Sequence, residues 1–368
     1  MSNQRKHITE IHYLRALACL MVVLVHVSAA FYNNQGKVWN DFTFFINQIS
    51  RFGTPIFALI SGFLLFYQVR NKGFKFNKFI TSRFTKIVIP FFFWSVFYLV
   101  FMYLMEGQNP LQAGEKLFLV NFIFGNSFYH LYFMSIVFQF YLVFPIFQLA
   151  RSRKSWVVLL GLAIIVNLYF LTSYTTGQFE SLWRTILNQR AFLPSWIFYF
   201  TFGGFLAYFW EPIARLSKKY VHVFSVLVVI IIALAVYEYK IVGSIPSNRA
   251  TNMLNIPLLT LFVIGITEQI VKFKWLKGFL TSIGTLSMSI YLVHPFVLYS
   301  FQQIAPDFFW NTVLFPVVFL IILGGSILTV RVTQLLPFNQ YILTIPKART
   351  QVKQINQSTQ HKQRSITQ

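Results

Sequence analysis

Residues 13–31 read YLRALACLMVVLVHVSAAF, an apolar run long enough to enter a lipid bilayer. The run contains two ionisable side chains, Arg15 and His26. They are eleven residues apart, which on an α-helix is about three turns plus 20°, so both point the same way, about 16 Å apart along the axis. Ionisable groups in a membrane helix are costly unless they face a polar interior, and by default they indicate a functional site.

A purely structural interpretation of this pair also remains open. In that interpretation, Arg15 extends its charged end to lipid headgroups at one interface. His26 then lies at the opposite interface, where a neighbouring side chain satisfies it. The spacing alone does not decide between a functional pair and two interfacial residues.

The composition indicates a membrane protein. Of the 368 residues, 56% are hydrophobic and 11% are charged, whereas soluble domains carry about 25% charged residues. The apolar runs are about 17–22 residues long, which favours helices over the short alternating strands of a β-barrel. The sequence has one cysteine, Cys19, so an intrachain disulfide and a cysteine metal site are excluded. We expect an all-α polytopic membrane protein without a metal site.

Ten apolar stretches predict about ten transmembrane helices. Most Lys and Arg residues fall in alternate connecting segments, and since positive residues favour the cytoplasmic side, both termini are predicted to be cytoplasmic. Residues 1–345 are predicted to form the transmembrane domain, and the polar, Gln-rich residues 346–368 a disordered tail. The predicted spans cover approximately residues 11–32, 48–68, 87–105, 130–149, 156–173, 195–213, 222–239, 252–271, 280–302 and 311–330.

The formal net charge of +22 would suggest nucleic-acid binding in a soluble protein. Here the basic residues flank apolar spans, so membrane topology explains them first and no nucleic-acid partner is expected. The most basic loop precedes the third predicted span, where Arg83 and Lys86 are predicted to share a helical face. This cluster either contacts lipid headgroups or holds the phosphates of an anionic donor.

Histidines are the main candidates for chemistry, because the common motifs of metalloproteases, serine hydrolases, ATPases and dehydrogenases are absent from the sequence. His26, His130 and His294 lie in or beside apolar spans. A neutral imidazole accepts a proton from a hydroxyl at physiological pH. Ser287 and Tyr291 precede His294 at spacings that place all three on one helical face. A basic donor site with a histidine base suits acyl transfer from a CoA-like thioester to a hydroxyl.

Four sequence elements occur in an order typical of one known family. The first is Arg15, ten residues, then His26. The others are FALISGFLL at 57–65, a basic pattern from Phe79 to Pro90, and IGTLSMSIYLVHP at 283–295. With these elements, about residues 8–335 resemble the integral-membrane O-acyltransferases called acyltransferase family 3, in the stand-alone type without an esterase-like domain. In its basic pattern the family tends to show two arginines, whereas this chain has Arg83 and Lys86, and lysine lacks the guanidinium fork.

The resemblance implies an O-acetyltransferase of the bacterial cell membrane that modifies polysaccharides of the cell envelope. It would move an acyl group, commonly acetyl, from cytoplasmic acyl-CoA to sugars or polymers on the outer side. His26 would then be the catalytic base and Arg15 would support the donor, while Arg83 and Lys86 would contact donor phosphates. The remaining candidates are predicted to shape the acceptor site or the transfer pathway: Ser287, Tyr291, His294 and His130.

Two other functions remain open. The chain is either a transporter or exporter of a polysaccharide or lipid-linked sugar, or a non-catalytic subunit of a wall-synthesis complex whose histidines are only packed. A proton-coupled transporter usually keeps a carboxylate in mid-membrane, and none is clear in this sequence. The expected partners are a cell-envelope glycan or lipid-linked sugar as acceptor, membrane lipids, and a wall-synthesis or esterase-like protein.

Overall fold

Helices form all the regular structure of the described part of the chain. The computed structural model describes residues 8–344, apart from 113, 151 and 175–180, and contains no strand in that part. By length and composition, eight helices there could cross a membrane, and two shorter apolar helices, Tyr132–Phe147 and Ile197–Tyr208, occupy the positions of the fourth and sixth predicted spans. The prediction of an all-α polytopic membrane protein is therefore confirmed. The eight long helices are Thr9–Asn34, Asp41–Lys72, Phe76–Glu106, Arg153–Ser173, Val221–Val242, Asn252–Lys272, Lys274–Ile304 and Thr312–Thr333.

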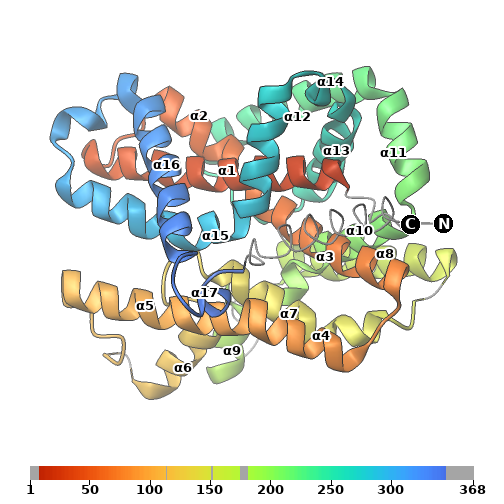
Figure 1. The fold of residues 1–368 in the computed structure, drawn as a ribbon, viewed down its shortest axis with the longest axis horizontal. Helices are drawn as coiled ribbons and strands as arrows, with labels where there is room; N and C mark the ends of the chain where they lie inside the picture. The colour runs from red at the N-terminus through yellow and green to blue at the C-terminus, as the bar shows by residue number, and fades with distance from the viewer. Residues whose placement is uncertain (1–7, 113, 151, 175–180, 345–368) are drawn as a thin grey trace, which may run out of the picture.

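Several of these spans are divided by local changes of the backbone. A π-helical turn, Phe84–Val88, joins α4 to α5, and another, Tyr169–Ser173, extends α8. The helices, labelled in Figure 1, are α1 (Thr9–Asn34), α2 (Asp41–Ser50), α3 (Gly53–Lys72), α4 (Phe76–Arg83), α5 (Ile89–Glu106), α6 (Glu115–Ile123), α7 (Tyr132–Phe147), α8 (Arg153–Leu168), α9 (Ser181–Leu187), α10 (Ile197–Tyr208), α11 (Trp210–Lys219), α12 (Val221–Val242), α13 (Asn252–Gly265), α14 (Thr267–Lys272), α15 (Lys274–Ile304), α16 (Phe315–Thr333) and α17 (Asn339–Ile342).

Helix α2 lies mostly between the first two predicted spans, 11–32 and 48–68. Its first turn is capped by Asn40, whose side chain accepts a hydrogen bond of 2.8 Å from the Thr43 backbone N–H. Such a cap satisfies one of the free backbone donors at a helix start. The capped helix then runs almost without interruption into α3, so that the second span is longer than the hydrophobic run indicated.

Helix α1 packs closely against α15 and α3 because glycines replace side chains at the contacts. A Cβ atom at Gly284 would overlap the His12 carbonyl group, and one at Gly53 would lie 2.9 Å from the Ala18 carbonyl oxygen. Gly62 and Gly203 make a similar contact between α3 and α10, where either added Cβ would overlap the backbone of the facing helix. Small residues are the usual means of close helix approach in membranes, and they hold α1 in the interior of the bundle.

The loops sort into two groups that lie at opposite ends of the bundle. At one end, Lys218 Nζ lies 3.6 Å from Glu10 and 3.4 Å from Glu268. At the other end, the Gln35 side chain donates to the Trp310 carbonyl oxygen at 2.6 Å. The segments predicted for one side of the membrane thus meet one another. The side on which the termini lie stays a prediction, and the predicted tail at 346–368 falls outside the described residues.

Candidate active site

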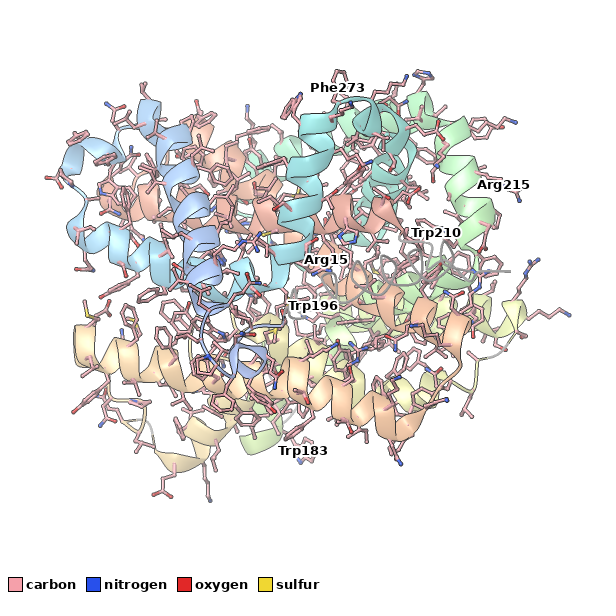
Figure 2. All side chains as sticks on the ribbon, in the orientation of Figure 1. Arg15, Trp183, Trp196, Trp210, Arg215 and Phe273 are labelled. Carbon is pink, nitrogen blue, oxygen red and sulfur yellow. The ribbon has the colours of Figure 1, made fainter. Side chains whose placement is uncertain are left out.

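The site begins where α1 packs on α15, near the centre of the molecule, in contrast to Arg215 at its edge (Figure 2). Arg15 Nε donates a hydrogen bond of 3.1 Å to Ser287 Oγ, and the Ser287 hydroxyl donates to the Gly284 carbonyl oxygen at 3.0 Å. Since the hydroxyl proton is used on Gly284, an oxygen lone pair is left for Arg15. The structure thus joins the Arg15–His26 helix to the predicted Ser287–His294 face.

His26 lies farther along α1, beside two other rings. Its ring centroid is 4.6 Å from that of Tyr129 and 5.2 Å from that of His294. His26 is partly exposed and Tyr129 is 43% exposed, whereas His130 and His294 are buried. Among these three histidines, His26 is therefore the one with surface exposed to solvent.

The two buried histidines lie next to each other behind His26. The ring centroids of His130 and His294 are 5.8 Å apart. His294 Nδ1 lies 3.1 Å from the Ile290 carbonyl oxygen. A carbonyl only accepts hydrogen bonds, so Nδ1 carries the proton and Nε2 is the acceptor. Nε2 is buried and has no hydrogen-bond partner in the described part of the chain. It is therefore free to accept a proton from a donor among the neighbouring side chains.

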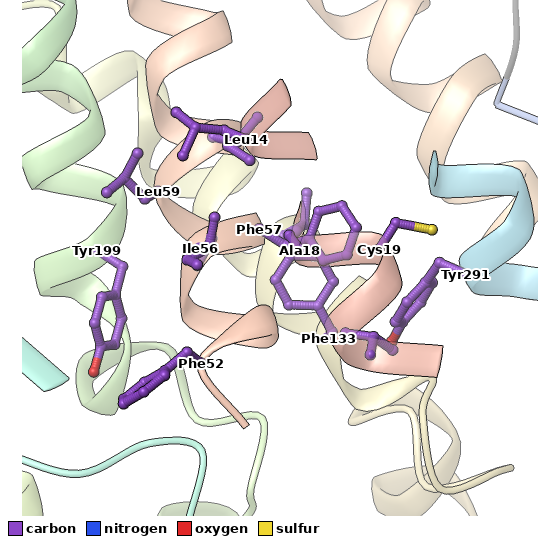
Figure 3. Close-up of a cluster of buried hydrophobic side chains, with 14 of the residues drawn as sticks. Leu14, Ala18, Cys19, Phe52, Ile56, Phe57, Leu59, Phe133, Tyr199 and Tyr291 are labelled. Atoms are coloured by element: carbon purple, nitrogen blue, oxygen red, sulfur yellow. The ribbon is translucent and has the colours of Figure 1, made fainter. Parts of the chain in front are cut away.

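Tyr291 connects the histidines to the aromatic core. Its hydroxyl donates a hydrogen bond to the His130 carbonyl oxygen. Its ring packs on Phe57 and Phe133, with centroid separations of 6.1 and 5.8 Å, and Figure 3 shows the three rings together beside α1. The three members of the predicted face thus have separate contacts: Ser287 with Arg15, Tyr291 with His130, and His294 with His26.

Arg83 lies on α4 and Lys86 on the π-helical turn that follows it. The prediction that they share a face is wrong, because Arg83 is half-buried whereas Lys86 is exposed. A π turn closes over five residues rather than four, so a spacing of three no longer aligns the side chains. Arg83 Nη2 donates to Gln68 Oε1 at 3.3 Å, and its guanidinium lies 5.5 Å from the Tyr141 ring centroid.

Three arginines that the sequence did not single out approach the site from other segments. Arg51 precedes α3, Arg190 precedes α10, and Arg249 lies in the loop before α13. Arg51 donates to Asn47, whose amide donates to the Val25 carbonyl oxygen next to His26. Arg190 donates to the Tyr132 hydroxyl, and the Arg249 guanidinium lies 5.2 Å from the ring centroid of Phe52, the neighbour of Arg51 in the chain. One signal in the sequence points to two of them: Arg190 and Arg249 fall between predicted spans on the side opposite the termini, against the usual bias of basic residues, whereas Arg51 lies near the start of the predicted span 48–68.

The structure contains no arrangement typical of a metal site in its described part. No group of three or more His, Cys, Asp or Glu side chains there is placed to hold a metal ion. The site presents imidazole, hydroxyl and guanidinium groups. An accessible imidazole provides a base, and the guanidinium groups provide hydrogen-bond donors for anions.

Comparison with known proteins agrees with this chemistry. A family model described as "Acyltransferase domain" matches residues 8–331. The chain is 26% identical over 328 residues to a protein of Staphylococcus aureus named "Probable poly-beta-1,6-N-acetyl-D-glucosamine export protein", covering 86% of this chain and 89% of that protein. A Staphylococcus epidermidis protein of the same name is 27% identical over 340 residues, covering 87% and 90%. No solved structure matches the chain significantly.

The family match is broad and includes the contacts described above. Residues 8–331 contain Arg15, His26 and the whole of α15. They also contain all the helices that are long or apolar enough to cross a membrane except the last residues of α16. The chain therefore belongs to acyltransferase family 3, as a multi-pass membrane protein.

Proposed function

We propose that this protein is an O-acyltransferase of the bacterial cell membrane that transfers an acyl group, commonly acetyl in its family, from cytoplasmic acyl-CoA to a hydroxyl of a cell-envelope or secreted polysaccharide. The partly exposed position of His26, next to the buried imidazole of His294 and on the same helix as Arg15, is the observation that carries the proposal. The names of the relatives mention a polysaccharide, poly-beta-1,6-N-acetyl-D-glucosamine, and this supports a glycan as the acceptor. A wall-synthesis or esterase-like protein is the expected partner.

The reaction starts with general-base catalysis by His26. Its imidazole accepts the proton of the acceptor hydroxyl while that oxygen attacks the thioester carbonyl carbon. The new C–O bond forms and the C–S bond breaks, so that CoA leaves as a thiolate. The thiolate takes the proton from the His26 imidazolium, which returns the base to its neutral form. Positioned bases of this kind contribute about 10²–10⁴-fold to a rate.

Arginine side chains support the donor in this proposal. Arg15 donates hydrogen bonds to the acyl-CoA, and Ser287 holds its guanidinium in one direction. Arg83 and Lys86 contact donor phosphates, with Lys86 acting as an exposed point charge. Helix rise separates Arg15 from His26 by about 16 Å, a gap that the pantetheine arm of CoA bridges.

The residues around His26 position the base and line the acceptor path. His294, whose Nδ1 is fixed by the Ile290 carbonyl oxygen, presents a second imidazole to His26. His130 and Tyr291 hold one another through the backbone of His130. This packing restricts the orientation of His26, and a base held in one orientation is more effective than a mobile one.

The test compares membranes that contain wild type, His26→Ala or His222→Ala at matched protein level. His222 is an exposed histidine near the start of α12 and serves as the matched control. Each sample receives radiolabelled acetyl-CoA and total envelope glycans. Label is expected on a glycan fraction with wild type and His222→Ala, and a loss of about 10²-fold or more with His26→Ala. Equal labelling by His26→Ala would contradict the mechanism.

Export of a polysaccharide is the second candidate function, because the relatives are named as probable export proteins. An exporter would move polysaccharide across the membrane without acyl-CoA and would leave its hydroxyl groups unmodified. The same membranes, prepared as inverted vesicles with a labelled glycan and no acyl-CoA, distinguish the two functions. Uptake of unmodified glycan that is equal in wild type and His26→Ala would favour the exporter.

A further inference from the structure

Arg51 is held at the level of His26 by a bridge between α2 and α1. Its Nε and Nη2 atoms donate to Asn47 Oδ1 at 3.2 and 3.0 Å. The Asn47 amide nitrogen in turn donates to the Val25 carbonyl oxygen and to Ser28 Oγ, both at 3.0 Å. Val25 directly precedes His26, so this chain of hydrogen bonds fixes the height of Arg51 along α1. The guanidinium has one neutral acceptor and no carboxylate in the described part of the protein.

Arg190 comes from the segment before α10, which contacts the Arg249 loop where the Asn248 amide donates to the Ser195 carbonyl oxygen at 2.6 Å. Its Nη2 donates to the Tyr132 hydroxyl at 3.1 Å, and its guanidinium lies 3.9 Å from the centroid of that ring. The Arg190 carbonyl oxygen accepts a hydrogen bond of 2.9 Å from Trp196 Nε1, and Gln139 donates to the carbonyl oxygen of Ala191 at 2.6 Å. Hydrogen bonds to the carbonyl oxygens of Arg190 and Ala191 therefore hold the backbone in place, while the Arg190 side chain remains exposed.

Arg249 is the buried member of the three, with 6% of its surface exposed. Its Nε lies 3.1 Å from Glu238 Oε2, and Nη1 donates to the Pro246 carbonyl oxygen at 3.1 Å. Nη2 is also buried, yet it has no hydrogen-bond partner among the described residues. The guanidinium lies 5.2 Å from the centroid of Phe52, which Figure 3 shows near Tyr199. The buried Tyr199 hydroxyl likewise lacks a partner there.

A purely structural role explains this arrangement incompletely. Each arginine does hold a loop or a helix in place, but their like charges repel one another in a medium of low dielectric constant. Only Arg249 has a carboxylate partner within the described residues. A donor left buried without an acceptor carries a penalty of about 1–3 kcal/mol. An oxyanion would relieve both problems, because guanidinium forks match carboxylate and phosphate oxygens.

We infer that Arg51, Arg190 and Arg249 form a binding site for an oxyanion, a phosphate or carboxylate carried by the acceptor glycan, and that this site places the acceptor hydroxyl beside His26. The assignment to the acceptor rests on the proposed function, with an acceptor that carries a charged group, unlike the N-acetylglucosamine polymer in the names of the relatives. The donor is assigned elsewhere, since Arg15 lies about 16 Å along α1 from His26 by helix rise, whereas the bridge from Arg51 joins α1 next to His26. The three arginines thus serve the substrate that approaches from the other end of the bundle.

The experiment measures binding to purified full-length protein in detergent, without any acyl donor, at constant ionic strength. The probes are N-acetylglucosamine 1-phosphate, glucuronic acid, neutral N-acetylglucosamine and CoA. At least one charged sugar is expected to raise the unfolding temperature, followed by tryptophan fluorescence, while the neutral sugar leaves it unchanged. Stabilisation by the sugar phosphate identifies a phosphate as the bound group, and stabilisation by the uronic acid identifies a carboxylate.

The variants are Arg190→Gln, Arg249→Gln and, as the control, Arg215→Gln, which removes an exposed arginine of α11. Arg190→Gln removes an exposed side chain with one hydrogen bond, so it tests the site even if Arg249→Gln fails to fold because Glu238 is left unpaired. We expect Arg190→Gln to weaken binding of the charged sugar at least fivefold and Arg215→Gln to leave it unchanged.

Three results with the sugar probes would overturn the inference, and a fourth concerns CoA. These are no stabilisation by either charged sugar, equal stabilisation by the neutral sugar, and wild-type binding by both Arg190→Gln and Arg249→Gln. Loss of CoA binding in these two variants would also overturn it, because the arginines would then belong to the donor site. None of these four binding measurements depends on acyl transfer. A failure of this inference can therefore be distinguished from a failure of the proposed acyl transfer in the glycan-labelling test.

Discussion

The Arg15–Ser287 hydrogen bond shows how a single residue pair connects distant parts of the sequence. The two residues are 272 positions apart, yet Arg15 Nε lies 3.1 Å from Ser287 Oγ. The Ser287 hydroxyl gives its proton to its own helix, at the Gly284 carbonyl oxygen. It is therefore a fixed acceptor for the guanidinium, in a position where water cannot readily replace it because Ser287 is fully buried.

Replacement of Ser287 by alanine is expected to weaken donor binding. Hydrogen bonds to charged groups contribute about 1.5–3 kcal/mol in soluble proteins and about 0.6 kcal/mol on average between membrane helices. An effect of roughly 1 kcal/mol predicts an increase of about fivefold in the KM for acetyl-CoA, with a smaller change in kcat. Initial rates of glycan labelling at varied acetyl-CoA concentration measure both constants.

Thr285→Ala is the matched control for this variant. Thr285 is exposed on the same helix, and its hydroxyl donates at 2.7 Å to the Thr281 carbonyl oxygen of its own helix. The Thr285→Ala variant removes a hydroxyl group from α15 and leaves the hydrogen bond of Arg15 unchanged. If Thr285→Ala raised the KM as much as Ser287→Ala, the role of the Ser287 acceptor in donor binding would be refuted.

At the scale of the elements, the approach of neighbouring helices depends on missing side chains. Gly62 of α3 faces the backbone of α10, and Gly203 of α10 faces the backbone of α3. The α3 contact matters for the site because the same helix carries Phe57, which packs against Tyr291. A change in the spacing of α3 and α10 is therefore transmitted to the residues that support the histidines.

Gly203→Ala is expected to reduce the free energy of unfolding by about 1–3 kcal/mol, because the added methyl group overlaps the backbone of α3 and the helices must separate. The control is Gly161→Ala in α8, where an added Cβ meets no atom within 4 Å. That variant is expected to be neutral or to stabilise by up to about 1 kcal/mol, since alanine is the better helix former. Thermal unfolding in detergent compares them, and an equal loss in both variants would exclude the packing explanation.

The α4–α5 junction illustrates the limit of helical periodicity. A spacing of three residues predicted one shared face for Arg83 and Lys86, but the turn Phe84–Val88 is π-helical. Arg83 consequently packs against Tyr141, whereas Lys86 is exposed. Regular periodicity is a property of the α-helix, so a wider turn removes it even where the sequence pattern is retained.

At the scale of the whole molecule, the two ends of the bundle carry different groups. One end has ion pairs from Lys218 to Glu10 and Glu268. The other end has the hydrogen bond from Gln35 to Trp310. The sequence predicts that the ion-paired end is cytoplasmic, because most basic residues fall in its loops. This orientation would place the acyl-CoA donor near Arg15.

Cysteine labelling at both ends of α12 tests the orientation. The native Cys19 is buried, so wild type is expected to remain unlabelled by a membrane-impermeant maleimide. Lys219 and Lys240 are exposed near the two ends of this helix, whose 22 residues extend about 33 Å. Lys240→Cys should react in intact cells, and Lys219→Cys only after permeabilisation. The reverse pattern would show that the bundle is inverted.

The sequence by itself determined the class of fold, because long apolar runs with few charges have no stable alternative to membrane-spanning helices. It also determined which residues share the interior face of one helix: Ser287, Tyr291 and His294 all meet α1 or the segment before α7, as regular helical geometry requires. The family was recognisable for the same reason, since its elements lie within single helices or short loops.

Only the tertiary structure decided which separate helices meet. It left His26 partly exposed and buried His130 and His294. It also joined Arg51 to α1 through Asn47, set Arg190 against Tyr132, and brought Arg249 to Phe52, the neighbour of Arg51. Helical periodicity describes one element at a time, whereas these contacts depend on glycine-mediated packing and on loops pinned by hydrogen bonds between helices. Their geometry is a property of the assembled bundle, and no local pattern encodes it.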